Sequence, residues 1–235
     1  GAASQNVTTG SGDVIVDTGS ISDITDAAIN GTAAGSLKIN VAANTDISDA
    51  TLTGTSGNAN ADLTIDIATN ADAITMTRAH NGLLGTVNDG ADATITLADA
   101  GAATGNANIG TYVLAAGAQT FTLGAAGQNV TLDGTGSNGV VQIDTDSQTT
   151  VSGTFDDNSG NDTILLNLET NNVNISSANT TDVDDIHLAN NVNATMSRAQ
   201  NALISTAAGT NQVTLSDSGA TTGRAEVDAY VLANG

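Results

Sequence analysis

The chain repeats itself. Met76 and Met196, which lie 120 residues apart, each begin a block of Met-Thr/Ser-Arg-Ala-His/Gln-Asn, and Tyr112 and Tyr230, 118 residues apart, each begin Tyr-Val-Leu-Ala. Two further blocks match in the same order, residues 94–101 with 212–219 and residues 1–8 with 124–131. Such self-similarity at a fixed period is typical of repeat architectures. We therefore expect copy 1 at residues 1–123 and copy 2 at residues 124–235, stacked as one continuous β structure.

Small side chains dominate the apolar positions. Of the 235 residues, 39% are hydrophobic but only 2% are aromatic, and the chain contains no Pro. A stacked sheet or solenoid can bury such small side chains in thin layers, whereas a globular core of this size needs more bulky ones. Without Pro, every sheet ladder can run uninterrupted.

Segments with apolar residues at every second position recur about every 10–12 residues, which favours many short strands. The clearest predicted strands are residues 36–41, 62–67, 94–97, 111–114, 119–123, 129–132, 140–143, 149–154, 163–168, 173–176, 185–188, 212–215 and 228–232. Asn pairs at residues 171–172 and 190–191 resemble solenoid corners, where side-chain amides bond the backbone of neighbouring coils.

The alternation breaks at residues 77–84 and again after Ser197, where one or two helical turns are predicted with Thr77 and Ser197 as N-caps. Arg78 and Arg198 are expected to cap these turns or to form ion pairs within them. Together these patterns predict an all-β fold, a parallel β-solenoid or β-helix built from two repeats of about 120 residues, each with one short helix. Two tandem β-sandwich domains are the alternative.

The charge balance restricts the possible partners. The formal net charge is −21, from four Lys and Arg against 25 acids, so no basic patch for nucleic acid can form. No apolar run is long enough to be inserted in a membrane. Apart from Glu169 and Glu226, the 23 remaining acids are Asp. Asp suits both tight turns and oxygen-rich calcium loops, so calcium sites and a plain solubilising surface both remain open.

The strongest candidate for a calcium loop is Asp156-Asp157-Asn158-Ser159-Gly160-Asn161-Asp162. Oxygen ligands at alternate positions, with a Gly that permits a sharp bend, are what calcium coordination needs. Asp13, after Gly-Ser-Gly, and Asp92, after Gly-Ala, lie in similar surroundings. The candidate metal ligands are therefore Asp156, Asn158, Asp162, Asp13 and Asp92. An Asp-rich solvent-exposed turn is the alternative for each of them.

Gly160-Asn161-Asp162-Thr163-Ile164 resembles the Gly-Asn-Asp-Thr-Leu core of the RTX repeats of secreted bacterial proteins. In that family the turn binds calcium between coils of a parallel β-roll, which implies a ligand role for Asp162 and, more loosely, for Asn158. The Met-Ser/Thr-Arg-Ala turn, the strand around Val213 and the Tyr-Val-Leu-Ala-Asn-Gly motif also resemble a repeat region of large adhesins and S-layer-like surface proteins. The resemblance implies secretion and an extracellular or cell-surface location.

An enzyme is not expected. His80 and His187 are the only imidazoles, and Gln200 stands at the position in copy 2 that matches His80. No Ser or Thr has a visible base partner or a nucleophile elbow. We therefore assign no catalytic residue.

The expected function is structural. We expect a subunit or segment of a surface layer, matrix fibre or adhesin stalk that binds calcium and assembles with itself head to tail through its terminal strands. The expectation rests on the chain ending where residues 119–123 would follow in a further copy. The alternative is an adhesin binding module that recognises a surface glycan or a host protein.

Overall fold

The fold is a stack of parallel strands. The computed structural model describes residues 6–9, 12–24, 26–31, 36–41, 45–53, 63–68, 73–88, 93–115, 119–133, 139–158 and 162–233. The chain is all-β, about 5% helical, and its parallel sheets stack as a β-solenoid of about 9 turns. A β-sandwich would require antiparallel sheets, so the predicted parallel β-solenoid is confirmed.

Two compact units divide the chain, and unit 1 comprises Gly1–Asp99 and Asn108–Val113. Its even-numbered strands form one sheet in the order β2-β4-β6-β8, while the odd-numbered strands form β1-β3-β5 and β7-β9-β11. The bounds are β1 Val7–Thr9, β2 Val14–Asp17, β3 Ala28–Gly31, β4 Leu37–Val41, β5 Thr51–Thr53, β6 Leu63–Ile67, β7 Ala73–Met76, β8 Leu84–Val87, β9 Thr94–Leu97 and β11 Thr111–Leu114. Isolated bridges align Asp23 with Asp46 and Asp46 with Thr75 of β7, so the sheet that contains β7 lies on a different side of the coils from β1-β3-β5.

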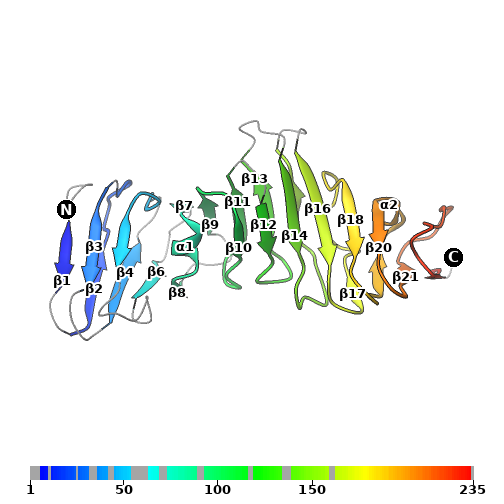
Figure 1. The fold of residues 1–235 in the computed structure, drawn as a ribbon, viewed down its shortest axis with the longest axis horizontal. Coiled ribbons are helices and arrows are strands. Elements are labelled where there is room, and N and C mark those ends of the chain that lie inside the picture. Colours follow the sequence, from blue (N-terminus) through cyan, green and yellow to red (C-terminus); the bar gives the residue numbers. More distant parts are fainter. Residues whose placement is uncertain are drawn as a thin grey trace. The chain divides into compact units, whose positions relative to one another are not determined.

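Unit 2 comprises Ala100–Ala107 and Leu114–Gly235. Its even-numbered strands run in the order β10-β12-β14-β16-β18-β20, and the odd-numbered ones form β13-β15 and β17-β19-β21, with β22 added beyond β21. Figure 1 shows β14, β16 and β18 side by side in that order. The bounds are β10 Ala102–Thr104, β12 Gln119–Thr122, β13 Asn129–Leu132, β14 Val140–Asp144, β15 Phe155–Asp156, β16 Thr163–Leu168, β17 Val173–Asn174, β18 Asp185–Leu188, β19 Ala194–Met196, β20 Ile204–Ala207, β21 Gln212–Leu215 and β22 Ala229–Val231.

The core consists of aliphatic ladders. In β4 the inward residues Leu37, Ile39 and Val41 pair in register with Leu63, Ile65 and Ile67 of β6, and all six are at most 2% exposed. Alternating residues of a strand point to opposite faces, so period-two patterning places each apolar side chain on the next coil's apolar side chain. Tyr112, Phe121 and Phe155 are also fully buried. Burial of each aliphatic side chain stabilises the stack by about 1.5–3 kcal/mol.

Short helices interrupt the strands at equivalent places in the two copies. Helix α1 spans Arg78–Asn81 with Thr77 as N-cap, and helix α2 spans Arg198–Ala202 with Ser197 as N-cap. Both N-caps are as predicted, and each side chain accepts a hydrogen bond from the backbone three residues on. Helix α1 is shorter than the predicted 77–84, because Leu84 pairs with Ile65 and begins β8.

The predicted strand at residues 149–154 differs from the structure. Only isolated bridges form there, at Thr150 with Asn174 and at Thr154 with Asn179. Gly153 lies directly against the backbone of the previous coil, where a Cβ would stand 1.8 Å from the carbonyl oxygen of Gln128. The close approach of two backbones leaves no room for a regular pleat, and β15 begins only at Phe155.

Candidate functional site

The corners of the solenoid show how the chain uses its Asp and Asn residues. At many corners an Asp or Asn side-chain oxygen accepts the backbone N–H of a residue on the neighbouring coil, at 2.8–3.0 Å and 17 to 25 residues away in sequence. We call these contacts inter-coil Asx bonds. They join Asn6 to Ala28, Asp13 to Ser36, Asp66 to Thr86, Asn129 to Thr154, Asp162 to Gly139, Asn171 to Asn193, Asp184 to Ile164, Asn191 to Thr210, Asn193 to Gln212 and Asp228 to Asn211.

The predicted Asn corners belong to this set. Asn171 and Asn191 form inter-coil Asx bonds, as the sequence indicated, and Asn193, which was not predicted, forms another. Asn172 and Asn191 adopt left-handed backbone angles, φ 64° and 60°, which Asn tolerates better than most residues. A short side chain places its oxygen within hydrogen-bonding distance of the adjacent backbone, which explains why the chain uses Asp and Asn rather than Glu and Gln at these positions.

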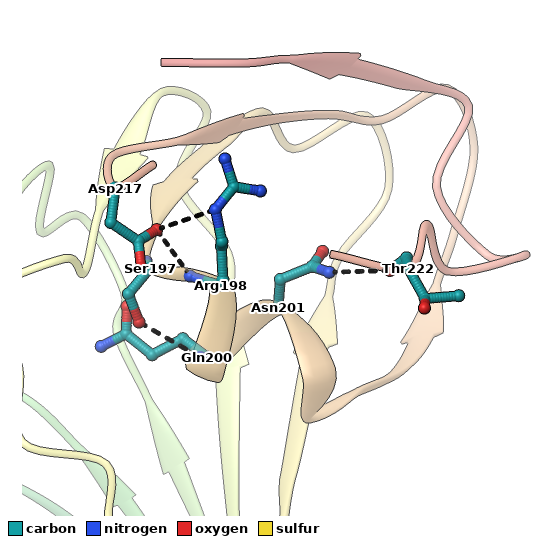
Figure 2. Close-up of polar contacts among 6 residues, drawn as sticks. All are labelled: Ser197, Arg198, Gln200, Asn201, Asp217 and Thr222. Carbon is teal, nitrogen blue, oxygen red and sulfur yellow. Dashed lines mark hydrogen bonds and ion pairs between the residues drawn. The ribbon is translucent and has the colours of Figure 1, made fainter. Parts of the chain in front are cut away.

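A larger polar arrangement is built around each helix. In copy 2 the N–H of Arg198 donates to Oδ1 of Asp217 at 2.8 Å, and Nδ2 of Asn201 donates to the carbonyl of Thr222 at 3.4 Å (Figure 2). Nε of Arg198 lies 3.9 Å from the same Asp217 oxygen, as the expected ion pair requires. The hydroxyl of Tyr230 donates to Oδ1 of Asn201 at 2.9 Å.

Copy 1 repeats this arrangement with its own residues. The N–H of Arg78 donates to Oδ1 of Asp99 at 2.7 Å, and the hydroxyl of Tyr112 donates to Oδ1 of Asn81 at 2.9 Å. The repeated blocks of the sequence are therefore the residues that attach each helix to its neighbouring coils.

One acidic cluster is the candidate metal site. Asp156 ends β15, Asp157 follows it, and Asp182 comes from the next coil, after the turn in which Oδ1 of Asn179 accepts from Thr181. One carboxylate oxygen from each of these Asp residues lies within 4.8 Å of the others. The three residues are buried or half-buried, and among the described His, Cys, Asp and Glu side chains this is the group that could hold a metal ion.

The electrostatics of the cluster suit a cation. The pKa of Asp182 is raised, first by desolvation and then by the negative charges of Asp156, Asp157 and Asp184. A divalent cation would offset this repulsion, and carboxylate oxygens are the ligands calcium prefers. Asp156 already accepts the N–H of Asn158 at 2.7 Å through Oδ1, so it would offer its other oxygen. Calcium takes six to eight oxygens, so water or backbone carbonyls would complete the shell.

The candidate ligands predicted from sequence do not gather at one place. Asp156 is in the cluster, whereas Asn158 is exposed with φ 55° and donates its N–H to Asp156. Asp162 and Asp13 are engaged in inter-coil Asx bonds to Gly139 and Ser36, and the two bonds from Ser36 lower the pKa of Asp13. Asp92 lies outside the described residues.

Sequence reasoning missed two members of the cluster. Asp157 lies in the run that was singled out, but its side chain was not assigned a role. Asp182 is separated from that run by a full coil, and no local motif marks it. Its position follows from the bridge between Thr154 and Asn179, which aligns the two coils just before their acidic residues.

Hollows lie among the described residues of unit 2. One, of about 360 Å³, is lined by Ser176, Ala178, Asn179, Thr180, Thr181, Ser197, Ala199, Gln200 and Leu203. Another, of about 460 Å³, is lined by Ala202 and residues 221–226. Hydroxyl and amide groups predominate in the first, which gives it the chemistry to hydrogen-bond a polar ligand.

Comparison of the chain with family models, curated proteins and solved structures found no match. Within the described residues, no helix has the length and apolar character that crossing a membrane requires.

Proposed function

We propose that the chain is an extracellular structural protein, a segment or subunit of a surface layer, matrix fibre or adhesin stalk. The observation that carries this proposal is the set of inter-coil Asx bonds, which join neighbouring coils within each unit, between Asn6 and Thr86 in unit 1 and between Asn129 and Asp228 in unit 2. A protein that must stay extended needs each coil attached to the next, because a solenoid has no single core to hold distant segments together. The resemblance to RTX and S-layer-like repeats supports the extracellular location.

End-to-end association is part of this proposal. Val231 of β22 is 43% exposed and Leu232 is 60% exposed, whereas Leu114, which matches Leu232 in copy 1, is 1% exposed. Exposed apolar residues beside an edge strand favour pairing with a further strand. A coil from a second molecule stacked on β22 would cover both side chains, as a homopolymer requires.

Sedimentation and negative-stain imaging at increasing concentration, with calcium and then with chelator, test the association. We expect filaments or lattices with calcium, and we expect Leu232→Lys to weaken them by placing a charge in the interface. Val140→Lys is the matched control, because Val140 is similarly exposed, at 56%, but lies in β14, which is paired on both sides, by β12 and β16. A chain that stays monomeric at high concentration with calcium, or an equal effect of both variants, would contradict the association.

Calcium binding at Asp156, Asp157 and Asp182 is the second part of the proposal. The clustering of three carboxylates from two coils supports it, because an ion there would link those coils. Calcium would then raise the melting temperature by binding the folded state alone. The pKa of Asp182 is raised, which means that its negative charge destabilises the folded state. Asp182→Asn removes this charge, so the apo protein should become more stable while the calcium-induced gain in melting temperature disappears.

Calorimetry and thermal melts with calcium and with chelator measure both effects. Asp162→Asn is the control, since the amide oxygen preserves the bond to Gly139 at a position outside the cluster. Unchanged melting on chelation would leave the three residues as a solvated acidic turn. That outcome would not by itself affect the structural role.

A binding module is the second candidate function, and the 360 Å³ hollow favours it. Ser176, Thr180, Thr181 and Ser197 bring hydroxyl groups together there. Such groups recognise glycan hydroxyls by hydrogen bonding. Glycan-array binding that Thr180→Trp abolishes by filling the hollow would support this function, and an absence of binding by the wild-type chain would contradict it.

A further inference from the structure

Helix α2 is attached to the preceding coil by Gln200. Its Nε2 donates to the carbonyls of Ile175 and Ala178 at 2.8 and 3.1 Å, and its Oε1 accepts the N–H of Ser197 at 2.8 Å. Gln200 is 3% exposed, so these bonds form out of water. The amide thus hydrogen-bonds both the carbonyls of the preceding turn and the backbone of the helix N-cap.

His80 occupies the matching position in copy 1. It is 7% exposed, and the carbonyls that accept hydrogen bonds from its imidazole are those of Ile47 and Ala50. These carbonyls correspond to those of Ile175 and Ala178, since in both turns the N–H of the alanine donates to the carbonyl of the isoleucine. Nδ1 of His80 is buried and has no hydrogen-bond partner among the described residues. The neutral tautomer with its proton on Nε2 therefore fits this site, and a second proton on Nδ1 does not.

We propose that His80 attaches helix α1 to its neighbouring coil in a pH-sensitive way. Acid then increases the local opening of copy 1, whereas copy 2, which has Gln200 at the same position, lacks this response. Protonation would place an imidazolium in a buried site and leave its Nδ1–H without an acceptor. Both consequences disfavour the packed helix, because a buried charge and a buried unpaired donor each cost free energy.

The charged groups around His80 set the sign of the effect. Asp99, whose Oδ1 accepts the N–H of Arg78, attracts the imidazolium and raises the pKa of His80. The turn contributes Asp46, which is engaged with Ser48, and the exposed Asp49. Burial nonetheless outweighs Asp99 and the two carbonyls, and the net pKa of His80 is lowered.

The unfolded chain takes up a proton at the ordinary histidine pKa of about 6.5, before the folded chain does. Between that pH and the lowered pKa of His80, the unfolded state therefore binds more protons than the folded state. The stability that neutral His80 contributes is present above about pH 6.5 and is lost as the pH falls toward the lowered pKa. The opening equilibrium of copy 1 then rises by up to about tenfold per pH unit.

Hydrogen exchange of the full chain at pH 7.5 and pH 5.0, corrected for the intrinsic exchange rate, tests the proposal. Residues 73–88 report on copy 1 and residues 194–207 on copy 2. We expect opening of copy 1 to increase by up to about 30-fold at the lower pH relative to copy 2, as 1.5 pH units below 6.5 allow. Equal responses of the two copies would overturn the proposal.

Three variants separate His80 from other titrating groups. His80→Gln installs the residue of copy 2 and should abolish the difference between the copies, while His187→Gln, which removes the other imidazole, should leave it unchanged. Gln200→His should transfer the pH response to copy 2. Because that variant also loses the bond to Ser197, its effect is measured as the ratio of opening at the two pH values. A response that survives His80→Gln would overturn the assignment.

Discussion

At the scale of single residues, Tyr112 and Tyr230 each donate a hydrogen bond to an equivalent asparagine, Asn81 in copy 1 and Asn201 in copy 2. Each hydroxyl lies 2.9 Å from the Oδ1 of its Asn, but Tyr112 is fully buried while Tyr230 is half-buried. Tyr112→Phe removes a donor from buried Asn81, and we expect it to cost about 1–3 kcal/mol. Tyr230→Phe should cost at least as much, because Asn201 is 0% exposed and the N–H of Arg224 also loses the hydroxyl oxygen as its acceptor. Urea unfolding followed by circular dichroism measures both, and a smaller effect of Tyr230→Phe would contradict this reading.

Gly153 provides a second test at this scale. A Cβ there would stand 1.8 Å from the carbonyl oxygen of Gln128, so Gly153→Ala must move one coil away from the next. Overpacking of this kind costs about 1–3 kcal/mol. Gly127→Ala is the matched control, since the nearest atom to its Cβ is 3.8 Å away, and it should change stability by less than about 0.5 kcal/mol. Equal melting temperatures for the two variants would show that the corner yields without strain.

Asp162 shows what an inter-coil Asx bond contributes at the scale of elements. Its Oδ1 accepts the N–H of Gly139 and thereby attaches the entry of β16 to the entry of β14. Asp162→Asn keeps an oxygen at this position and should be nearly neutral, whereas Asp162→Ala should cost about 1 kcal/mol. Melting temperatures with chelator present isolate the bond from any metal. Equal losses for both variants would assign the stability to the charge instead.

The elements differ in how well the sequence predicts them. Leu37–Val41 and Thr163–Leu168 were predicted because each has three buried aliphatic residues at period two. Ala102–Thr104 was missed, since two alanines and a threonine give no alternating pattern, and it forms a strand by pairing with β12. Ile204–Ala207 was missed because it follows the helix so closely that its apolar residue could continue the helical face.

The candidate site was less predictable than the fold. Asp156 carries a local motif, but Asp182 joins it only because two coils align, and coil lengths vary. Paired residues of successive strands are 26 apart at Leu37 and Leu63 but 17 apart at Gln212 and Ala229. A motif that is local in sequence therefore predicts one side of such a site, and the register between coils determines the other.

At the scale of the whole molecule, stability depends on contacts between neighbouring coils. Within each unit, neighbouring described coils are joined by ladders, aliphatic layers and inter-coil Asx bonds. In such an array stability is approximately a sum of coil and interface terms, and a change in one place acts locally. The two copies should therefore respond to equivalent substitutions independently.

Asp99→Ala and Asp217→Ala test this independence. Each removes the oxygen that accepts the N–H of the first helical residue, Arg78 or Arg198, and each should cost about 1 kcal/mol. Because the two sets of contacts share no residue, the double variant should lose the sum of the single losses to within about 0.5 kcal/mol. Hydrogen exchange should show the increased opening confined to the copy that carries the substitution. A coupling energy above about 1 kcal/mol would mean that the copies unfold as one cooperative body, in which case local loosening of copy 1 at His80 would spread to copy 2.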